Sequence, residues 1–459
     1  MENLRIYVST YNVGTSYPDQ ELRELLSLTN QKSDKIPDFF ILGFQEVKAQ
    51  PQNMLMDTLF DDPWTTACRE VLKKNYIQLK SVRLQGLLLL VFGLRKHLLN
   101  IRDIESEYTR TGLAGMWGNK GAVSIRLSIY GCSICFVNSH LSAHDNQLKD
   151  RVDDYNNIIA EQEFHVNETS KIFYHDYVFW LGDLNFRLLE EYDKTPDEIE
   201  RMVVKKELKT LFEHDQLRAV MKKGEAFSEL TEQDPDFPPT FKFEVGTPCY
   251  DHKRRPAWCD RILYCVNSNN YENVTLKVDQ LSYKSHPIYT LSDHIPVTAD
   301  FMIKIPQQVQ KIMKEPSMQL SVDQVFSDYS ECVIQFQEIV SWKADDENKT
   351  CYTVTKAIPE TEEDWIGLFK ENFSSLDDYV TYEYVSKCAT LDRTLSVSAP
   401  EGDGSSTVEY NSFNRPRKYE VTFPELPNPQ KIKYCLVYFS QSEDKVTSVL
   451  GVSNAFPFH

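Results

Sequence analysis

Carboxylate, amide and imidazole side chains recur in short motifs along residues 1–300. Glu46 and Asn12 offer a carboxylate and an amide oxygen, which are ligand types that Mg2+ prefers. Asp183 can take a proton from an attacking water, and Asn185 can hold that water or a phosphoryl oxygen by its amide. Together these residues predict metal-assisted hydrolysis of a phosphate ester.

Two histidines fit the same chemistry. His140 and His294 can be kept protonated beside carboxylates, and an imidazolium stabilises the negative charge of a phosphoryl transition state. Asp293 precedes His294 directly, but neighbours along a strand point to opposite faces. We therefore expect another acid to orient the His294 ring, and Asp260 is the candidate.

Cations gather in residues 253–261, where Lys253, Arg254 and Arg261 lie close in sequence to an acid and a tryptophan. Lys242 and Lys120 can extend this basic group, and a small substrate with several phosphates needs that many cations. The chain as a whole has a formal net charge of −18. Because nucleic-acid binding draws most of its affinity from phosphate neutralisation, this charge argues against broad nucleic-acid binding.

The polar motifs stand at the ends of apolar, strand-like runs. A sheet can aim polar side chains from its strand ends into one cleft while its core stays dry. A helical stretch is expected over residues 196–211, and the alternation of strands and helices predicts an α/β domain. The strand-like runs span residues 5–13, 39–44, 87–94, 122–127 and 177–181.

The pattern changes near residue 310. Residues 305–316 are polar and bounded by Pro306 and Pro316, which suits a connector. We predict a first domain over residues 1–305, a linker over 306–318 and a second domain over 319–459. The second domain has short aromatic and β-branched runs separated by Pro, Gly and Asn, which predict a β-sandwich.

The ten cysteines are scattered, and Cys132-x-x-Cys135 has no second pair to complete a zinc site. We therefore expect structural or inert thiols. The longest apolar run, residues 87–94, is too short to span a membrane, and residues 1–5 lack the features of a signal peptide. These observations predict a cytoplasmic protein.

Taken together, the motifs over residues 1–303 resemble the inositol polyphosphate 5-phosphatase family. The resemblance implies the endonuclease/exonuclease/phosphatase fold, a four-layer α/β sandwich. It also implies Mg2+-dependent hydrolysis of the 5-phosphate of phosphatidylinositol 4,5-bisphosphate and 3,4,5-trisphosphate, and of soluble inositol polyphosphates. The segments that carry it are residues 42–46, 118–123, 138–141, 180–187, 239–243, 256–261 and 292–294.

The resemblance also assigns roles to individual residues. It makes Glu46 the principal metal ligand, with Asn12 and Asp293 close by. Asp183 becomes the base for the attacking water, and Asn185 positions that water. The scissile phosphate is held by His140 and by His294, which Asp260 orients. The 4-phosphate is gripped by Lys242, Lys253, Arg254 and Arg261. The sequence departs from the family at Phe241, where a tyrosine is usual, so a hydroxyl contact is lost.

The C-terminal part resembles the SKICH domain, an immunoglobulin-like sandwich that supplies location rather than chemistry. The resemblance implies a monomer that meets a phosphoinositide head group at a membrane surface and a protein partner through the SKICH domain. Recruitment is then peripheral, to the plasma membrane or endoplasmic reticulum. Leu98, Leu99 and Ile101 are candidates for contact with the lipid, while Trp365 and Phe369 are expected to be core residues.

Two other functions compete with this interpretation. A metal-dependent nuclease of the same fold would use the same metal, carboxylate and imidazole groups on a phosphodiester. A non-catalytic adaptor would work through its SKICH domain alone. The adaptor is disfavoured because Glu46, Asp183, Asn185 and His294 are all present.

Overall fold

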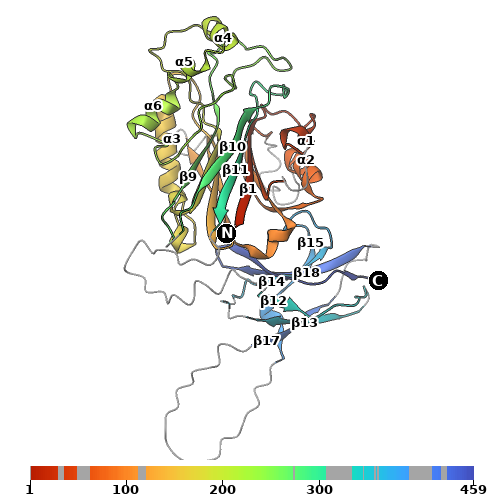
Figure 1. Ribbon diagram of the computed structural model, residues 1–459. Helices are drawn as coiled ribbons and strands as arrows, with labels where there is room; N and C mark the ends of the chain where they lie inside the picture. The colour runs from red at the N-terminus through yellow and green to blue at the C-terminus, as the bar shows by residue number, and fades with distance from the viewer. Residues whose placement is uncertain are drawn as a thin grey trace, which may run out of the picture. The chain divides into compact units, whose positions relative to one another are not determined.

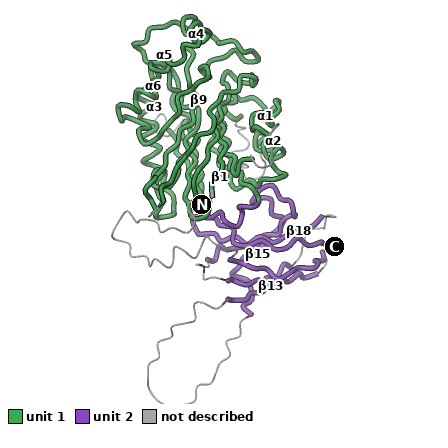
Figure 2. The backbone as a smooth tube through the Cα atoms, in the orientation of Figure 1, with its two compact units in different colours: residues 1–95, 104–316 green, residues 96–103, 317–459 purple. Residues whose placement is uncertain are grey.

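The structure is a computed structural model that describes residues 2–28, 36–48, 62–111, 120–271, 274–305, 333–344, 346–355, 358, 361–391, 416–424 and 432–459. The chain divides into two compact units, one of residues 1–95 and 104–316 and the other of residues 96–103 and 317–459 (Figure 2). The linker predicted over residues 306–318 lies outside the described residues. Each unit is considered by itself below.

The first sheet of the larger unit has the strand order β10-β11-β1-β2-β4-β3. β1 runs parallel to β2 and antiparallel to β11. Every residue of β2 and β4 is buried, which explains why their sequences are continuous apolar runs. The strands are β1 (Glu2–Asn12), β2 (Phe39–Gln45), β3 (Tyr76–Leu84), β4 (Leu87–Leu94), β10 (Val278–Ser285) and β11 (Val297–Ile305).

A second sheet of this unit has the order β5-β6-β7-β8-β9. β7 and β8 are parallel, so their carboxyl ends share one edge. Buried amides join the two sheets, because Gln45 Nε2 of β2 lies 2.6 Å from Asn138 Oδ1 of β7. The strands are β5 (Ile101–Thr111), β6 (Lys120–Ile129), β7 (Cys132–His140), β8 (Tyr177–Asp183) and β9 (Asp260–Val266).

Helices cover the outer faces of both sheets, which gives the four layers that the resemblance implied (Figure 1). α1 (Leu22–Leu25) and α2 (Pro63–Leu72) pack against the first sheet, with Trp64 and Leu25 in its core. α3 (Leu148–Glu161) and α6 (Gln216–Lys223) pack against the second, with Tyr155 and Leu217 in its core. The α/β prediction is therefore confirmed.

The helix expected over residues 196–211 forms two helices. α4 (Pro196–Val204) begins with a capping box between Thr195 and Glu198, and α5 (Leu208–Phe212) follows it. Lys206 between them has φ 61°, a left-handed conformation that ends a helix. Short 3-10 helices complete the chain: η3 (Arg95–Asn100), η5 (Asn167–Thr169), η6 (Ile172–Tyr174) and η7 (Val385–Lys387).

The smaller unit is a β-sandwich, as predicted. Its sheets have the orders β12-β13-β17-β16 and β15-β14-β18-β19, with β20 (Phe456–Pro457) paired to β18. Phe369 is fully buried as expected, whereas Trp365 is partly exposed and stacks on Phe439. The strands are β12 (Ile334–Phe336), β13 (Asn348–Val354), β14 (Trp365–Lys370), β15 (Tyr379–Tyr384), β16 (Ala389–Thr390), β17 (Arg417–Phe423), β18 (Lys433–Gln441) and β19 (Thr447–Val452).

Residues 96–103 belong to the smaller unit although they come early in the sequence. Arg102 Nη1 donates to the carbonyl of Val449 at 2.8 Å, and both Leu98 and Ile101 are buried. The hypothesis that Leu98 and Ile101 dip into lipid is therefore wrong, because their side chains serve packing. None of the described helices has the length and apolar content to cross a membrane.

Candidate active site

Strand register brings the predicted polar residues together. His140 at the end of β7 lies opposite Asp183 at the end of β8, and Asp183 lies opposite Asp260 at the start of β9. On the first sheet, Asn12 at the end of β1 lies opposite Gln45, which precedes Glu46. Polar strand ends of both sheets therefore form one site, as the motif positions predicted.

Gly182 allows β8 to approach β7 closely just before Asp183. Its φ is 145°, and a Cβ atom at this position would lie 2.0 Å from the carbonyl oxygen of Ser139. No side chain other than hydrogen fits there. The glycine in the Trp-Leu-Gly-Asp motif is thus required by the approach of the two strands that carry His140 and Asp183.

Asp183 is a buried carboxylate surrounded by donors. Its Oδ2 accepts from Asn12 Nδ2 at 3.0 Å and lies 3.2 Å from His140 Nε2. Its Oδ1 accepts from the main-chain N–H of Asn185 at 3.1 Å. Burial opposes its charge, but the nearby imidazoles of His294 and His140 outweigh this and lower the pKa of Asp183. Asp183 is therefore an anion at any working pH.

His294 lies between two buried carboxylates. Its Nδ1 is 2.9 Å from Asp260 Oδ2, and its Nε2 is 3.7 Å from Asp183 Oδ2. Burial disfavours the imidazolium, but Asp260 and Asp183 outweigh it and raise the pKa of His294 to about 9. Thr240 Oγ1 donates to Asp260 Oδ2 at 2.7 Å and so fixes the carboxylate that orients the ring. The predicted role of Asp260 as the partner of His294 agrees with this geometry.

His140 differs from His294. Its Nε2 contacts the ammonium of Lys120, which β6 places beside it because Gly121 pairs with His140. Burial and the Lys120 charge lower the pKa of His140, although Asp183 opposes them. The two imidazoles therefore differ, because the pKa of His140 is lowered and that of His294 is raised. Burial likewise lowers the pKa of Lys120 against the pull of Asp183 and Glu46.

Glu46 can hold a cation. Its φ of 55° is left-handed, and backbone strain of this kind is typical of functional sites. Its side chain is 40% exposed, and Oε1 is 3.2 Å from Asn12 Nδ2 and 3.8 Å from His140 Nε2. Oε2 makes no hydrogen bond with the described residues, so a hard divalent cation fits this oxygen.

Asn12 is at the predicted place but is turned differently. Its Nδ2 donates to both Glu46 and Asp183, while its Oδ1 accepts from the main-chain N–H of Gly14 at 3.1 Å. The amide therefore presents nitrogen, not oxygen, to these carboxylates. In this arrangement Asn12 orients Glu46 and Asp183 through its Nδ2, and its predicted role as a metal ligand stays a prediction.

Three of the predicted phosphate-binding cations, Lys242, Lys253 and Arg254, lie near one another. Asp251 N donates to the carbonyl of Lys242 at 2.8 Å, which places Lys242 beside the loop that carries Lys253 and Arg254. The Lys253 side chain is 85% exposed, and Arg254 is also exposed. Lys242 Nζ is 2.7 Å from Asp293 Oδ2. The partner of Asp293 in the structure is thus a lysine.

Arg261 is not part of this group. Its side chain is fully buried, and it forms ion pairs with Asp215 at 3.0 Å and with Glu232. Because both carboxylates occupy the guanidinium, the prediction that Arg261 grips a phosphate is wrong. Arg255 also has a structural task, since it pairs with Asp145 and donates to the carbonyls of Leu188 and Tyr192.

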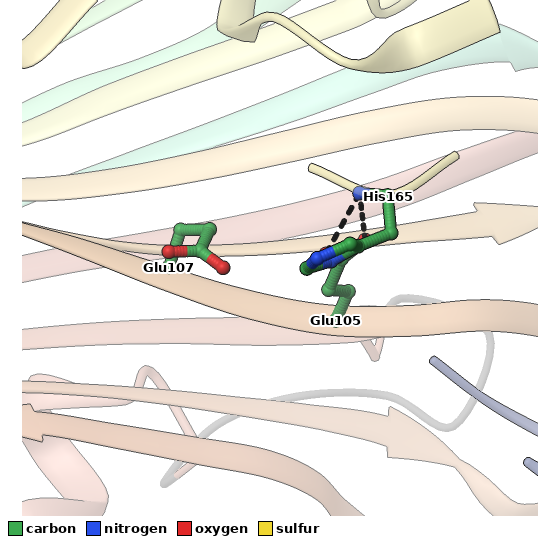
Figure 3. Close-up of side chains that lie close together, drawn as sticks. All are labelled: Glu105, Glu107 and His165. Carbon is green, nitrogen blue, oxygen red and sulfur yellow. Dashed lines mark hydrogen bonds and ion pairs between the residues drawn. The ribbon is translucent and has the colours of Figure 1, made fainter. Parts of the chain in front are cut away.

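Asp183, Asp260 and His294 have the spacing of metal ligands, because one ligand atom from each residue lies within 4.8 Å of those of the other two. Glu105, Glu107 and His165 form a second such group on β5 and a neighbouring loop (Figure 3). In the second group Glu105 accepts from His165 N at 2.9 Å and lies 2.6 Å from Nδ1 (Figure 3). Its carboxylate therefore ties the loop to the strand.

Two site residues were missed in the sequence. Thr240 holds Asp260, and Arg187 Nη2 donates to Asn185 Oδ1 at 2.6 Å. Thr240 lies in the motif of residues 239–243 and Arg187 in that of residues 180–187. Their place in these motifs was the feature of the sequence that could have identified them. Thr240 and Asp260 are 20 residues apart, and the contact between Arg187 and Asn185 depends on how the backbone turns between them. Residue spacing therefore could not predict either contact.

Comparison with known proteins agrees with this site. Residues 9–300 match the endonuclease/exonuclease/phosphatase family 2, and residues 334–458 match the SKICH domain. The chain is 34% identical to human phosphatidylinositol 4,5-bisphosphate 5-phosphatase A over 92% of its own length and 41% of that relative. It is 31% identical to mouse inositol polyphosphate 5-phosphatase K over 99% of its length and 89% of that relative.

A solved structure supports the same assignment. The inositol polyphosphate 5-phosphatase domain of a synaptojanin, in complex with inositol (1,4)-bisphosphate and calcium ion, matches with a TM-score of 0.56 and 32% identity. The match covers 66% of this chain and 86% of that domain. The chain belongs to the inositol polyphosphate 5-phosphatase family and carries a C-terminal SKICH domain.

Proposed function

We propose that this chain is a phosphatase that removes the 5-phosphate from phosphatidylinositol 4,5-bisphosphate and phosphatidylinositol 3,4,5-trisphosphate, and also from soluble inositol polyphosphates. The observation that carries the proposal is the pairing of an ionised Asp183 with an imidazolium at His294, whose pKa is raised to about 9. An anionic acceptor beside a fixed cation suits a water that attacks a phosphoryl group. The relatives' names supply the substrate class.

Each residue then has a defined task. Asp183 orients the attacking water through a hydrogen bond and accepts its proton as the new phosphorus–oxygen bond forms. The bond between phosphorus and the inositol 5-oxygen breaks, the leaving oxygen takes up a proton from solvent, and Asp183 releases its proton to solvent. His294 donates from Nε2 to a phosphoryl oxygen while Asp260 holds Nδ1. His140 lies beside Asp183 and contacts the Lys120 side chain. His140 and Lys120 together therefore add positive charge to the same side of the site. Asn12 keeps the carboxylates of Glu46 and Asp183 in place.

Mg2+ is the cation we propose for Glu46. Its oxygen ligand and partial exposure suit a hard cation that keeps several waters. When bound, the cation supplies neutralisation of the charge that develops on phosphoryl oxygens. The calcium ion of the related solved structure is consistent with a divalent cation but leaves the choice of Mg2+ to experiment.

Selectivity for the 5-position follows from the exposed cations. Lys253 and Arg254 lie on one loop, the partly exposed Lys242 lies beside it, and the three can bind a neighbouring 4-phosphate while the 5-phosphate meets the carboxylates. Phe241 has no hydroxyl to add to this grip. We therefore propose that the substrate is a small head group with adjacent phosphates rather than a nucleic acid.

The test is phosphate release with Mg2+ from 4,5-bisphosphate, 3,4,5-trisphosphate and 5-monophosphate lipids and from inositol 1,4,5-trisphosphate. Asp183→Asn is the inactive variant, with an expected loss on the order of 10²–10⁴ in rate. Asp153→Asn on the exposed side of α3 is the matched control and should keep wild-type activity. A plasmid-nicking assay runs in parallel.

Release from substrates that carry both 4- and 5-phosphates, lost in Asp183→Asn but not in Asp153→Asn, is the expected result. Nicking of plasmid without phosphate release would overturn the proposal in favour of a nuclease. Silence in both assays would leave a non-catalytic adaptor as the function. Equal release from 5-monophosphate lipid would contradict the role given to the basic loop.

The SKICH domain is the part of the chain to which we assign cellular location. We propose that a protein partner binds this domain and recruits a monomeric enzyme from the cytoplasm to the plasma membrane or endoplasmic reticulum. The match of residues 334–458 to the SKICH domain supports this proposal. Fractionation of cells that express the chain with and without residues 319–459 tests this; unchanged membrane association after truncation would contradict it.

A further inference from the structure

The Asn185 side chain is held at both ends. Its Nδ2 donates to the carbonyl of Leu141 at 3.0 Å, and its Oδ1 accepts from Arg187 Nη2 at 2.6 Å. Its main-chain φ of 56° is left-handed, and its N–H is bonded to Asp183 Oδ1. An amide nitrogen has two donors. Among the residues that the structure describes only the Leu141 carbonyl accepts from Nδ2, so one N–H of the amide remains for a ligand.

Arg187 is a rigid partner for this amide. Its Nε donates to the main-chain carbonyl of Asn185 at 3.1 Å, so the guanidinium grips residue 185 twice. Its own backbone is fixed by Gln216, which accepts from Arg187 N at 2.9 Å and donates to Arg187 O at 2.8 Å. The guanidinium also lies 4.2 Å from the centroid of the Phe241 ring, which packs against His294.

The surroundings of Arg187 differ from those of a purely structural arginine. Arg261 is buried against two carboxylates. Arg187 is also buried, yet no carboxylate pairs with it among the residues that the structure describes, and its Nη1 has no hydrogen-bond partner there. A buried guanidinium without a carboxylate is costly, because its charge is not compensated. Because Arg187 donates two hydrogen bonds to Asn185, we expect its function to be the orientation of that residue.

The chemistry of the pair determines the orientation of the amide. A guanidinium has donors and no acceptor. If the Asn185 amide were turned over, its NH2 group would face Nη2 and its oxygen would face the Leu141 carbonyl, so two hydrogen bonds would become two repulsive contacts. The observed orientation is thus the only one that both partners accept.

We propose that Arg187 is a positioning residue that locks the Asn185 amide as a hydrogen-bond donor in the active site. The free N–H of Asn185 then donates to an oxygen of the phosphoryl group undergoing transfer, and Asn185 does not accept a hydrogen bond from the attacking water. Of the two roles expected for Asn185 from the sequence, the orientation of its amide favours contact with a phosphoryl oxygen over positioning of the water. The inference rests on the proposed phosphatase function.

The test measures kcat and KM for inositol 1,4,5-trisphosphate and Mg2+, with thermal melting of each variant. Asn185→Ala should lower kcat on the order of 10²-fold, which is typical of one lost donor to a transition state. Arg187→Met should lower kcat by about tenfold or more, with KM changed by less than about threefold. Arg201→Met on α4, an exposed arginine, is the control and should match the wild type.

The double variant shows whether Arg187 acts through Asn185. In the Asn185→Ala background, Arg187→Met should cost less than about threefold more, because the amide it orients is gone. Losses that multiply would overturn the inference. Arg187→Lys should recover only part of kcat, since an ammonium lacks the planar pair of donors; full recovery would also overturn it.

The Asn185→Asp variant tests whether the side chain of residue 185 acts as a hydrogen-bond donor or as an acceptor. This test leaves Arg187 in place. A carboxylate keeps an acceptor for Arg187 but cannot donate, so kcat should fall as far as in Asn185→Ala; because an oxygen then faces the Leu141 carbonyl, the melting temperature should fall as well. Retained kcat in Asn185→Asp would show that Asn185 acts as an acceptor and would overturn the inference. An inactive wild type would instead remove the proposed function.

Discussion

His294 Nδ1 lies 2.9 Å from Asp260 Oδ2, and the carboxylate is fully buried. The two residues are 34 positions apart in the sequence and come from different segments, the start of β9 and the approach to β11. Burial raises the pKa of the Asp260 carboxyl, and the ion pair with His294 opposes that rise. The contact therefore keeps the imidazole both charged and oriented.

The alkaline limit of activity should report this pair. Because the pKa of His294 is raised to about 9, the imidazolium is present at neutral pH and is lost as the pH rises through that value. Asp260→Asn removes the main group that raises this pKa, so the alkaline limb of kcat/KM should move at least about one unit lower. Asp153→Asn should leave the limb in place. A limb that stays near 9 in Asp260→Asn would show that another group sets it.

Removal of the metal should abolish activity, and Glu46 should set the affinity for the metal. Chelation followed by return of Mg2+ should restore the wild type. Glu46→Gln keeps the shape of the side chain but removes its charge, so the Mg2+ concentration for half-maximal activity should rise on the order of 10–100-fold. Glu161→Gln, an exposed glutamate at the end of α3, is the control. An unchanged Mg2+ dependence in Glu46→Gln would place the metal elsewhere.

Arg261 and Lys253 should separate stability from substrate binding. Arg261→Met leaves Asp215 and Glu232 buried without their partner, which should cost about 3–5 kcal/mol in the free energy of unfolding by urea. Lys253→Ala, on an exposed side chain, should change that free energy by less than about 0.5 kcal/mol but raise KM for inositol 1,4,5-trisphosphate about tenfold. The reverse pattern would mean that the two cations have exchanged roles.

His286 should make stability depend on pH. Burial lowers its folded-state pKa from 6.5 to about 4, and its Nε2 is 2.7 Å from Thr298 Oγ1. Between these values the unfolded chain binds more protons than the folded chain, so this histidine makes stability rise with pH from about 4 to 6.5.

The measurement compares urea unfolding at pH 5.5 and 7.5. His286→Gln keeps a donor near Thr298 but does not titrate, so the difference in unfolding free energy between the two pH values should shrink by about 0.5–1 kcal/mol relative to the wild type. An identical pH dependence in both proteins would assign it to other groups.

The sequence alone determined the α/β and β-sandwich classes and the family, and it predicted most of the polar residues that the structure brings together in one site. Asn12, His140 and Asp183 could be found because each ends an apolar strand, and Glu46 because it directly follows one; strand ends are where a sheet presents polar groups. The same local logic separated the two domains, since the pattern of apolar residues changes on either side of residue 310.

The tertiary structure alone decided how each group is used. Lys253 and Arg261 share one basic segment, yet one is exposed and the other is buried between carboxylates from distant parts of the chain. His140 and His294 look alike in sequence, yet burial and the Lys120 charge lower the pKa of the first, while Asp260 and Asp183 outweigh burial and raise the pKa of the second. Burial, charge and amide orientation depend on neighbours that strand register brings together, and spacing along the chain does not encode these contacts.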